Sequence, residues 1–271
     1  LRRARPEGLP ERLIDMHQIL PAIDAMGEAQ LMAMRELRIE RALLQSVPDQ
    51  ARSIMGNRAL RELATERPES FWASHFVDPR APDAIRELDR AAASGVRVIK
   101  LLPPAGFRLD DDAHEAFLDR MQALGLVAMV HTGFITARHK NEEASAGVVL
   151  SSSLAEPLSL DRPARKFPDL TIILCHLGGV IWHEQAAQMV TQHDNVWGDV
   201  SGFGLFALQR LLRARANLDW NKVFWGNDSP PFAYPLNLRL LRTALQEYDA
   251  EALLPLLLFE NARRFADARL S

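Results

Sequence analysis

The stretch Leu126-Val127-Ala128-Met129-Val130-His131 places five consecutive apolar residues directly before a histidine. An apolar run of this length, without polar alternation, is typical of a strand that is buried on both faces of a parallel sheet. Seven more short runs have a similar composition. In chain order the eight runs are Leu13–Met16, Arg41–Ser46, Phe71–Val77, Val96–Leu101, Leu126–Val130, Thr171–Cys175, Asn195–Val200 and Val223–Trp225.

Longer segments with helical spacing separate most of these runs. Strands that alternate with helices form parallel sheets, because a parallel strand pair requires a crossover connection. The predicted helical segments are Ala22–Leu37, Arg52–Thr65, Pro82–Ala93, Asp111–Leu124, Trp182–His193, Phe203–Ala216 and Leu236–Glu247.

The number of these units distinguishes between two α/β architectures. Eight β/α units in about 250 residues predict a single (β/α)8 barrel, which a chain of 271 residues can accommodate. An open doubly wound sheet is the alternative, but it normally carries a glycine-rich phosphate turn, and no G-x-G-x-x-G motif occurs. We assign residues 13–271 to the barrel and residues 1–12 to a disordered or extended N-terminal arm.

Composition limits the class of partner. The chain has 32 Lys and Arg against 35 Asp and Glu, a net charge of −3, so we expect no nucleic-acid or anionic-membrane partner but a small-molecule substrate. No apolar stretch reaches the roughly 18 residues of a transmembrane helix. The single Cys175 lies in an apolar run, which predicts a buried, inert thiol and a reducing, cytoplasmic location.

Titratable side chains stand at the ends of six of the predicted strands. Barrel active sites form at the carboxyl ends of the strands, where polar side chains are otherwise unexpected. Imidazole and carboxylate groups gathered there are the donors that suit Zn(II), Mn(II) or Fe(II). The six residues are His17, Lys100, His131, His176, Asp199 and Asp228.

The longest irregular stretch is Gly133–Ser159. An insertion of this length in a compact barrel is often a lid or a substrate loop, although a mobile surface loop is an equal alternative.

Several of these segments, in this order, resemble the amidohydrolase-related family of metal-dependent barrel hydrolases and decarboxylases. The resemblance extends over the whole chain, and it is specific only when the motifs are taken together. The matching segments are Leu13-Ile14-Asp15-Met16-His17, Val130-His131-Thr132-Gly133, Cys175-His176-Leu177-Gly178-Gly179, Gly226-Asn227-Asp228-Ser229-Pro230 and Asn261-Ala262-Arg263-Arg264-Phe265.

The resemblance implies a role for each of these site residues. His17 and His131 would be metal ligands, Asp228 a ligand or proton shuttle, and His176 the residue that orients or protonates the substrate. The cofactor would be one divalent ion, Zn(II) or alternatively Mn(II) or Fe(II), and relatives suggest a homodimer. Lys100 would bind a substrate carboxylate, with a carbamylated metal bridge or a lysine that reaches the solvent at the rim as alternatives.

One position departs from the family pattern. The first strand normally ends in His-x-His, and here Ile19 replaces the second histidine. Because isoleucine cannot donate to a metal, we expect weaker metal binding than in relatives, or none. Asp15 is a candidate substitute, since Asp15 and His17 would share one face of a regular strand.

Two other polar residues are open to more than one interpretation. Asp199 resembles a commonly polar family position, and it could bond neighbouring backbone or meet substrate. His75, on the third predicted strand, is expected to have a hydrogen-bonded structural role rather than to line the barrel mouth.

Three functions remain compatible with the sequence. The leading hypothesis is hydrolysis of a small carboxylated, ester, lactone or amide substrate by metal-activated water. The second is non-oxidative decarboxylation, which uses the same residues. The third, motivated by Ile19, is a degenerate barrel that binds a ligand without turnover.

Overall fold

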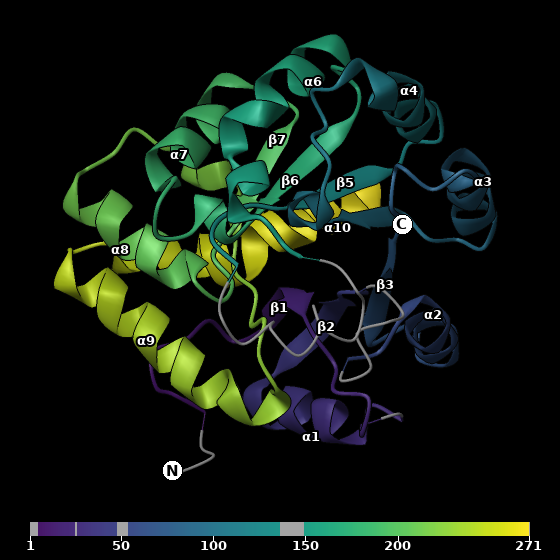
Figure 1. The fold of residues 1–271 in the computed structure, drawn as a ribbon. Helices are drawn as coiled ribbons and strands as arrows, with labels where there is room; N and C mark the ends of the chain where they lie inside the picture. Colours follow the sequence, from purple (N-terminus) through teal and green to yellow (C-terminus); the bar gives the residue numbers. More distant parts are fainter. Residues whose placement is uncertain (1–4, 25, 48–53, 136–148, 271) are drawn as a thin grey trace.

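The chain folds into the predicted (β/α)8 barrel. The computed structural model describes residues 5–24, 26–47, 54–135 and 149–270, and within these ranges eight parallel strands follow one another around the sheet in chain order (Figure 1). Two backbone hydrogen bonds join the last strand region to the first. Met16 N donates to Trp225 O at 3.1 Å, and Asp228 N donates to His17 O at 2.8 Å. These two bonds form the seam that closes the barrel.

The strands coincide with the predicted apolar runs to within about two residues. The agreement follows from burial on both faces, which requires apolar residues throughout each strand. The strands are β1 (Leu13–Gln18), β2 (Ile39–Leu44), β3 (Phe71–Phe76), β4 (Val98–Leu101), β5 (Val127–His131), β6 (Thr171–Cys175), β7 (Val196–Asp199) and β8 (Val223–Phe224).

The helices surround the barrel, and most of them lie within the predicted helical segments. Helical spacing did not reveal α6, which is short, and only the family resemblance indicated α10. The helices are α1 (Glu28–Leu37), α2 (Asn57–Glu66), α3 (Ala84–Ala93), α4 (Glu115–Ala123), α6 (Asp161–Lys166), α7 (His183–Gln192), α8 (Gly204–Arg213), α9 (Tyr234–Glu247) and α10 (Asn261–Arg269).

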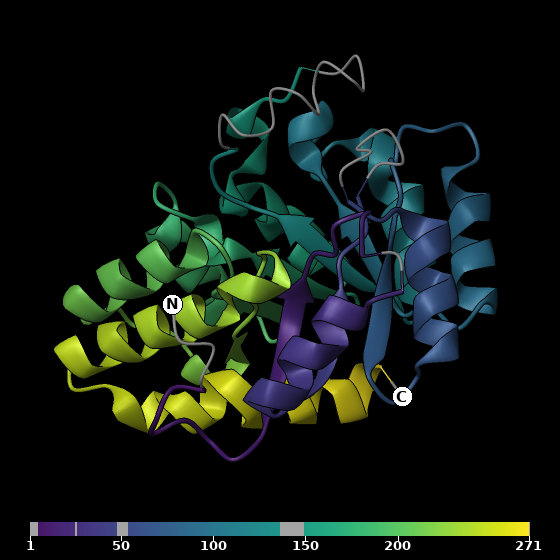
Figure 2. The same cartoon turned by 90° about the horizontal axis from the view of Figure 1, so that it is seen from below.

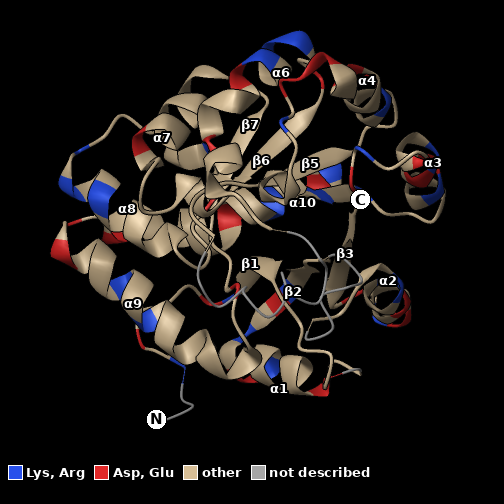
Figure 3. Ribbon diagram, in the orientation of Figure 1, with Lys and Arg blue, Asp and Glu red and all other residues tan. Residues whose placement is uncertain are grey.

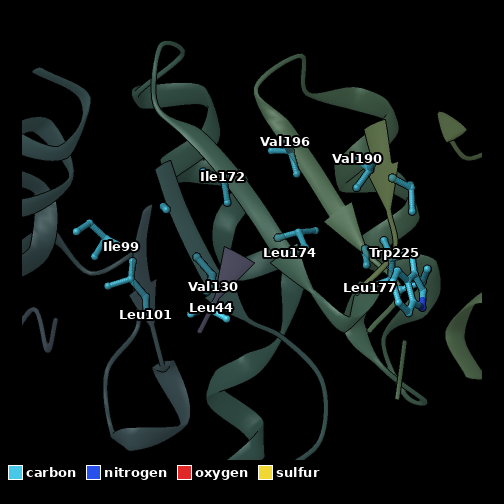
Figure 4. Close-up of a cluster of buried hydrophobic side chains, with 14 of the residues drawn as sticks. Leu44, Ile99, Leu101, Val130, Ile172, Leu174, Leu177, Val190, Val196 and Trp225 are labelled. Atoms are coloured by element: carbon cyan, nitrogen blue, oxygen red, sulfur yellow. The ribbon is translucent and has the colours of Figure 1, made fainter. Parts of the chain in front are cut away.

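Side-chain alternation along the strands creates two apolar layers. On β5, Val127 and Met129 belong to the inner layer, whereas Ala128 and Val130 pack outward against the helices. Figure 4 shows part of the outer layer, including Val130 of β5 and outward residues of the two paired strands, Ile99 and Leu101 of β4 and Ile172 and Leu174 of β6. A residue two positions beyond an inner residue therefore points to the barrel axis.

Helix α10 closes one end of the barrel. Its residues Ala262, Phe265 and Ala266 pack in the inner layer, and the Phe265 ring meets Phe224 edge-on at 5.2 Å between centroids. Figures 1 and 2 show α10, in yellow, lying across this end. The carboxyl ends of the strands are at the other end, where the predicted site residues stand.

Charged residues of both signs are interspersed along the outer helices (Figure 3). In the described part of the chain, no helix has the combination of length and apolar character that crossing a membrane requires.

Two less regular segments were singled out in the sequence. Residues 5–12 contain no helix or strand, and Arg242 Nη1 donates to Glu7 O at 2.6 Å. Of the Gly133–Ser159 insertion, residues 136–148 lie outside the described residues, and the lid remains a prediction. The described end of the insertion is anchored, since Ser151 N donates to Pro104 O at 2.8 Å.

Candidate functional site

A bulge at the end of β1 turns His17 into the barrel. The strand register shifts between Asp15 and Gln18, so the regular alternation is interrupted. Ile14 and Met16 belong to the inner layer, and regular alternation would send His17 outward with Asp15. Instead, the His17 ring contacts Asp199 of β7, with 2.9 Å between Nδ1 and Oδ2.

Asp15 faces outward, toward α9. Its Oδ1 accepts from the backbone N of His17 at 2.9 Å and of Asn227 at 3.1 Å, and its Oδ2 accepts from Tyr234 Oη at 2.5 Å. Burial raises the pKa of Asp15 to about 6, although the Tyr234 hydroxyl opposes this shift. The prediction that Asp15 and His17 share one face is therefore wrong, because the bulge separates them.

His176 lies just beyond β6, in a left-handed backbone conformation that residues other than glycine rarely adopt. Its φ is 62° and that of Leu177 is 43°, a left-handed conformation that costs about 1–2 kcal/mol per residue. The preceding residues Ile173 and Cys175 point into the barrel. The turn brings the His176 ring to 4.9 Å from the His17 ring, measured between centroids.

Asp228 reaches the same pocket from the loop after β8. Its φ of 43° is also left-handed, and the seam hydrogen bond to His17 O fixes its backbone. Its Oδ1 lies 3.7 Å from His17 Nε2 and its Oδ2 lies 3.9 Å from His176 Nδ1. Donor atoms of His17, His176 and Asp228 all lie within 4.8 Å of one another.

His131 and Lys100 also point toward the barrel axis, because each stands two residues beyond an inner-layer residue. The His131 ring lies 5.0 Å from the His176 ring, centroid to centroid. Lys100 Nζ donates to Cys175 Sγ at 3.0 Å, and Lys100 is 7% exposed. The structure thus brings together the four predicted residues from β1, β5, β6 and β8, with Lys100 deeper in the barrel. Their individual roles stay predictions.

His75 lies away from this pocket, as expected. It packs on the outer side of β3, where its Nε2 lies 2.6 Å from Glu87 Oε1 on α3.

Ser201 is the site residue that sequence reasoning missed. Its Oγ lies 3.0 Å from His17 Nδ1 and 2.9 Å from His176 Nδ1. It also donates to Asp199 Oδ1. The only signal in the sequence was its position two residues after Asp199, just beyond β7. Serine is too common in loops for that position to indicate a function.

The two histidines differ in protonation. Burial and Lys100 disfavour charge on His17, but Asp199, together with Cys175, outweighs them and raises the pKa of His17 to about 10. The pKa of Asp199 is correspondingly lowered: burial alone would raise it, and the His17 cation reverses that effect. Burial lowers the pKa of His176 to about 4, with Asp228 opposing the shift only in part. At neutral pH, His17 is therefore an imidazolium and His176 is neutral.

The tautomer of His176 follows from its hydrogen bonds. Its Nδ1 lies 3.1 Å from the carbonyl oxygen of Ser201. Because a carbonyl can only accept, the ring proton is on Nδ1 and the lone pair is on Nε2.

The donor set fits a divalent ion. Within the described residues a second group also converges, made of His17, Cys175 and Asp199. In that group both Asp199 oxygens and the Cys175 sulfur already accept hydrogen bonds from protein donors. The group with Asp228 is the better candidate, because His17 faces Asp228 Oδ1 through Nε2 at 3.7 Å, whereas its Nδ1 already contacts Asp199.

Comparison with known proteins agrees with this geometry. The family model described as amidohydrolase matches residues 14–266. The chain belongs to the amidohydrolase family. Members of this family are metal-dependent enzymes, which accords with a site built from histidine and aspartate. None of the curated proteins matches the sequence significantly.

Several solved structures share the amidohydrolase barrel at low sequence identity. The 2,6-dihydroxybenzoate decarboxylase from Rhizobium has a TM-score of 0.63 at 16% identity, over 96% of this chain and 99% of that one. A 5-carboxyvanillate decarboxylase from Novosphingobium aromaticivorans, complexed with manganese and a nitrobenzoic acid ligand, has 0.60 at 17%, over 89% and 80%. Dihydroorotase from Campylobacter jejuni has 0.59 at 16%, over 94% and 83%. At these identities the likeness shows the fold alone.

Proposed function

We propose that this amidohydrolase is a metal-dependent hydrolase that acts on a small carboxylated, ester, lactone or amide substrate. The observation that carries the proposal is the convergence of donor atoms from His17, His176 and Asp228 within 4.8 Å at the carboxyl ends of the strands. Such a set of buried imidazoles and a carboxylate is most simply explained by one divalent ion, for which Zn(II) is our first choice.

His17, His131 and Asp228 are the proposed ligands of the ion. The Nδ1 of His17 faces Asp199, so its Nε2, which faces Asp228, is the nitrogen placed to bind. When bound, a divalent ion would supply Lewis acidity for a substrate carbonyl and would lower the pKa of water toward about 7. Ion binding at His17 would also release a proton, because His17 is an imidazolium in the metal-free protein.

For His176 we propose the role of general base, in place of the role of orienting or protonating the substrate that the resemblance implied. Its neutral ring holds a lone pair on Nε2, since Ser201 O accepts the Nδ1 proton. Hydrolysis requires a group that accepts a proton from water, whereas decarboxylation requires a donor that protonates a ring carbon. The lone pair on His176 Nε2 supports the proposal of hydrolysis. Release of CO2 without incorporation of water into the product would instead establish decarboxylation.

Lys100 is proposed to bind a substrate carboxylate at the base of the pocket. Its ammonium group already reaches the barrel interior, where it bonds Cys175 Sγ. A substrate carboxylate would replace that weak acceptor with a stronger one.

Metal analysis tests the proposal. We expect about one equivalent of a divalent ion in protein purified without chelator, and loss of that ion in His131→Asn and Asp228→Asn. His176→Asn should keep the ion and lose turnover. Asp169→Asn is the control, because Asp169 is exposed and precedes β6, at the end of the strand opposite to His176. Wild-type protein that holds no metal and is not activated by Zn(II) or Mn(II) would overturn the proposal in favour of a binding barrel.

We also propose a cytoplasmic homodimer. The single cysteine supports the location. Exposed apolar side chains on and beside α8 and α9 support self-association, notably Phe206 (50% exposed) and Phe232 (84% exposed). Sedimentation equilibrium is the test, and a monomer at all concentrations would contradict the dimer.

A further inference from the structure

The Asp199 carboxylate accepts hydrogen bonds from both His17 and His176. It is completely buried. Its Oδ2 lies 2.9 Å from His17 Nδ1, and its Oδ1 accepts from the backbone N of His176 at 3.0 Å and of Ser201 at 3.0 Å. One carboxylate thus holds the ring of one histidine and the strained backbone of the other.

Ser201 completes this arrangement. Its hydroxyl donates to Asp199 Oδ1, while its Oγ lies within 3.0 Å of both Nδ1 atoms. Its carbonyl oxygen also lies 3.1 Å from His176 Nδ1. Both Nδ1 atoms therefore face acceptors, and a proton on each is required to avoid a repulsive contact.

We infer that Asp199 and Ser201 form a tautomer clamp, which keeps the Nδ1 proton on His17 and His176 and leaves their Nε2 atoms for the ion and for proton transfer. The inference rests on the proposed function. Ligand histidines generally donate their second N–H to a carboxylate or carbonyl, and loss of that partner costs about 10–100-fold in metal affinity or activity. Asp199 and Ser201 are thus positioning residues and act through the histidines.

A purely structural role for Asp199 makes a different prediction. If it served only to hold the His176 turn, its loss would lower stability but leave the His17 ring unchanged. The side-chain amide introduced by Asp199→Asn has nearly the same shape as the carboxylate, and its oxygen can still accept from the backbone of His176 and Ser201. The NH2 group then faces His17 Nδ1 and forces the ring proton to Nε2, the nitrogen proposed to bind metal.

Two measurements test the clamp. The first is Zn(II) affinity, by competition with a chromophoric chelator: Asp199→Asn should bind roughly 10–100-fold more weakly and Ser201→Ala roughly threefold or more. The second is a long-range 1H–15N spectrum of the histidine rings in the metal-free proteins. It should show a proton on His17 Nδ1 in addition to the one on Nε2 in wild type, and a proton on Nε2 alone in Asp199→Asn.

Asp161→Asn is the matched control, because Asp161 also pairs with an imidazole, His193 Nε2 at 2.9 Å, but lies on α6 outside the barrel. It should keep wild-type affinity. An unchanged His17 pattern together with unchanged affinity in Asp199→Asn would overturn the clamp. If that variant does not fold, Ser201→Ala decides alone, since it removes a single hydroxyl. Wild-type protein without metal would refute the proposed function, while the metal-free spectra would still test the clamp.

Discussion

Replacing Gly226 with alanine should separate β1 from the end of β8. Gly226 directly follows Trp225, whose carbonyl accepts one of the two seam hydrogen bonds. A Cβ at this position would lie 2.3 Å from His17 Cβ, 2.8 Å from His17 N and 2.9 Å from His17 Cα. These three atoms of His17 are fixed by the backbone, so they cannot move away by a side-chain rotation. The two chain segments must therefore move apart, by roughly 1 Å to restore normal carbon contacts.

The energetic cost can be estimated from the contacts that such a movement disturbs. Overpacking of a tight site costs about 1–3 kcal/mol. Weakening the seam hydrogen bonds, Met16 N to Trp225 O and Asp228 N to His17 O, adds about 0.5–1.5 kcal/mol for each. We therefore expect Gly226→Ala to lower the free energy of unfolding by about 2–6 kcal/mol.

Urea denaturation measures this loss, with Gly125→Ala as the control. Gly125 has a φ of 63°, and a Cβ there would meet nothing within 4 Å. That variant isolates the backbone cost of a left-handed residue, about 1–2 kcal/mol. Gly226→Ala should also weaken metal binding, because the seam carries His17 and Asp228, whereas Gly125→Ala should not. A loss in Gly226→Ala no greater than that in Gly125→Ala would refute the steric reasoning.

Three other substitutions have defined outcomes. Asn57→Ala should lower the free energy of unfolding, measured by urea denaturation, by about 2–3 kcal/mol. The reason is that the Asn57 side chain hydrogen-bonds both the N–H (2.7 Å) and the carbonyl (2.9 Å) of Phe76. Zn(II) affinity should not change, and a loss of affinity would argue against a purely structural role. Tyr234→Phe should lower the free energy of unfolding by about 1–3 kcal/mol. The loss should be greater at pH 8 than at pH 5, because the pKa of Asp15 is about 6 and the lost hydroxyl donates to the ionised carboxylate. Equal losses at the two pH values would contradict this. Ile19→His should raise Zn(II) affinity by roughly tenfold or more, measured by chelator competition, and no gain would mean that residue 19 does not reach the ion.

The sequence predicted the barrel because burial on both faces leaves a simple pattern. The bounds of β6, Thr171–Cys175, agree with the predicted run at both ends. The start of α1 was less predictable, since helical spacing suggested Ala22 and the helix begins at Glu28. Gly27, with a φ of 65°, and Asp24, which accepts from Ala29 and Gln30 N–H groups, form a turn there instead. Local side-chain to backbone bonds of this kind do not disturb the apolar spacing, so the spacing cannot reveal them.

The sequence predicted which residues form the site but not the hydrogen bonds between them. Period-two alternation places Lys100, His131 and Asp199 on the axis without further information, because each follows an inner-layer residue by two positions. It fails for His17, since a bulge is a one-residue change of register that apolar composition does not encode. Ser201 was missed because its importance depends on two histidines from distant strands.

The β1 bulge places the acid and the histidine at the end of β1 in different surroundings. The bulge turns His17 toward Asp199 and frees Asp15 to bond Tyr234 and the backbone of Asn227. Asp15 thereby fixes the loop that carries Asp228, on the outer side of the same seam. Closing the barrel and the proposed binding of an ion are thus divided between Asp15 and His17. Isoleucine at position 19 cannot donate to an ion, and the contacts of Asp15 with Tyr234 and of His17 with Asp199 do not include it.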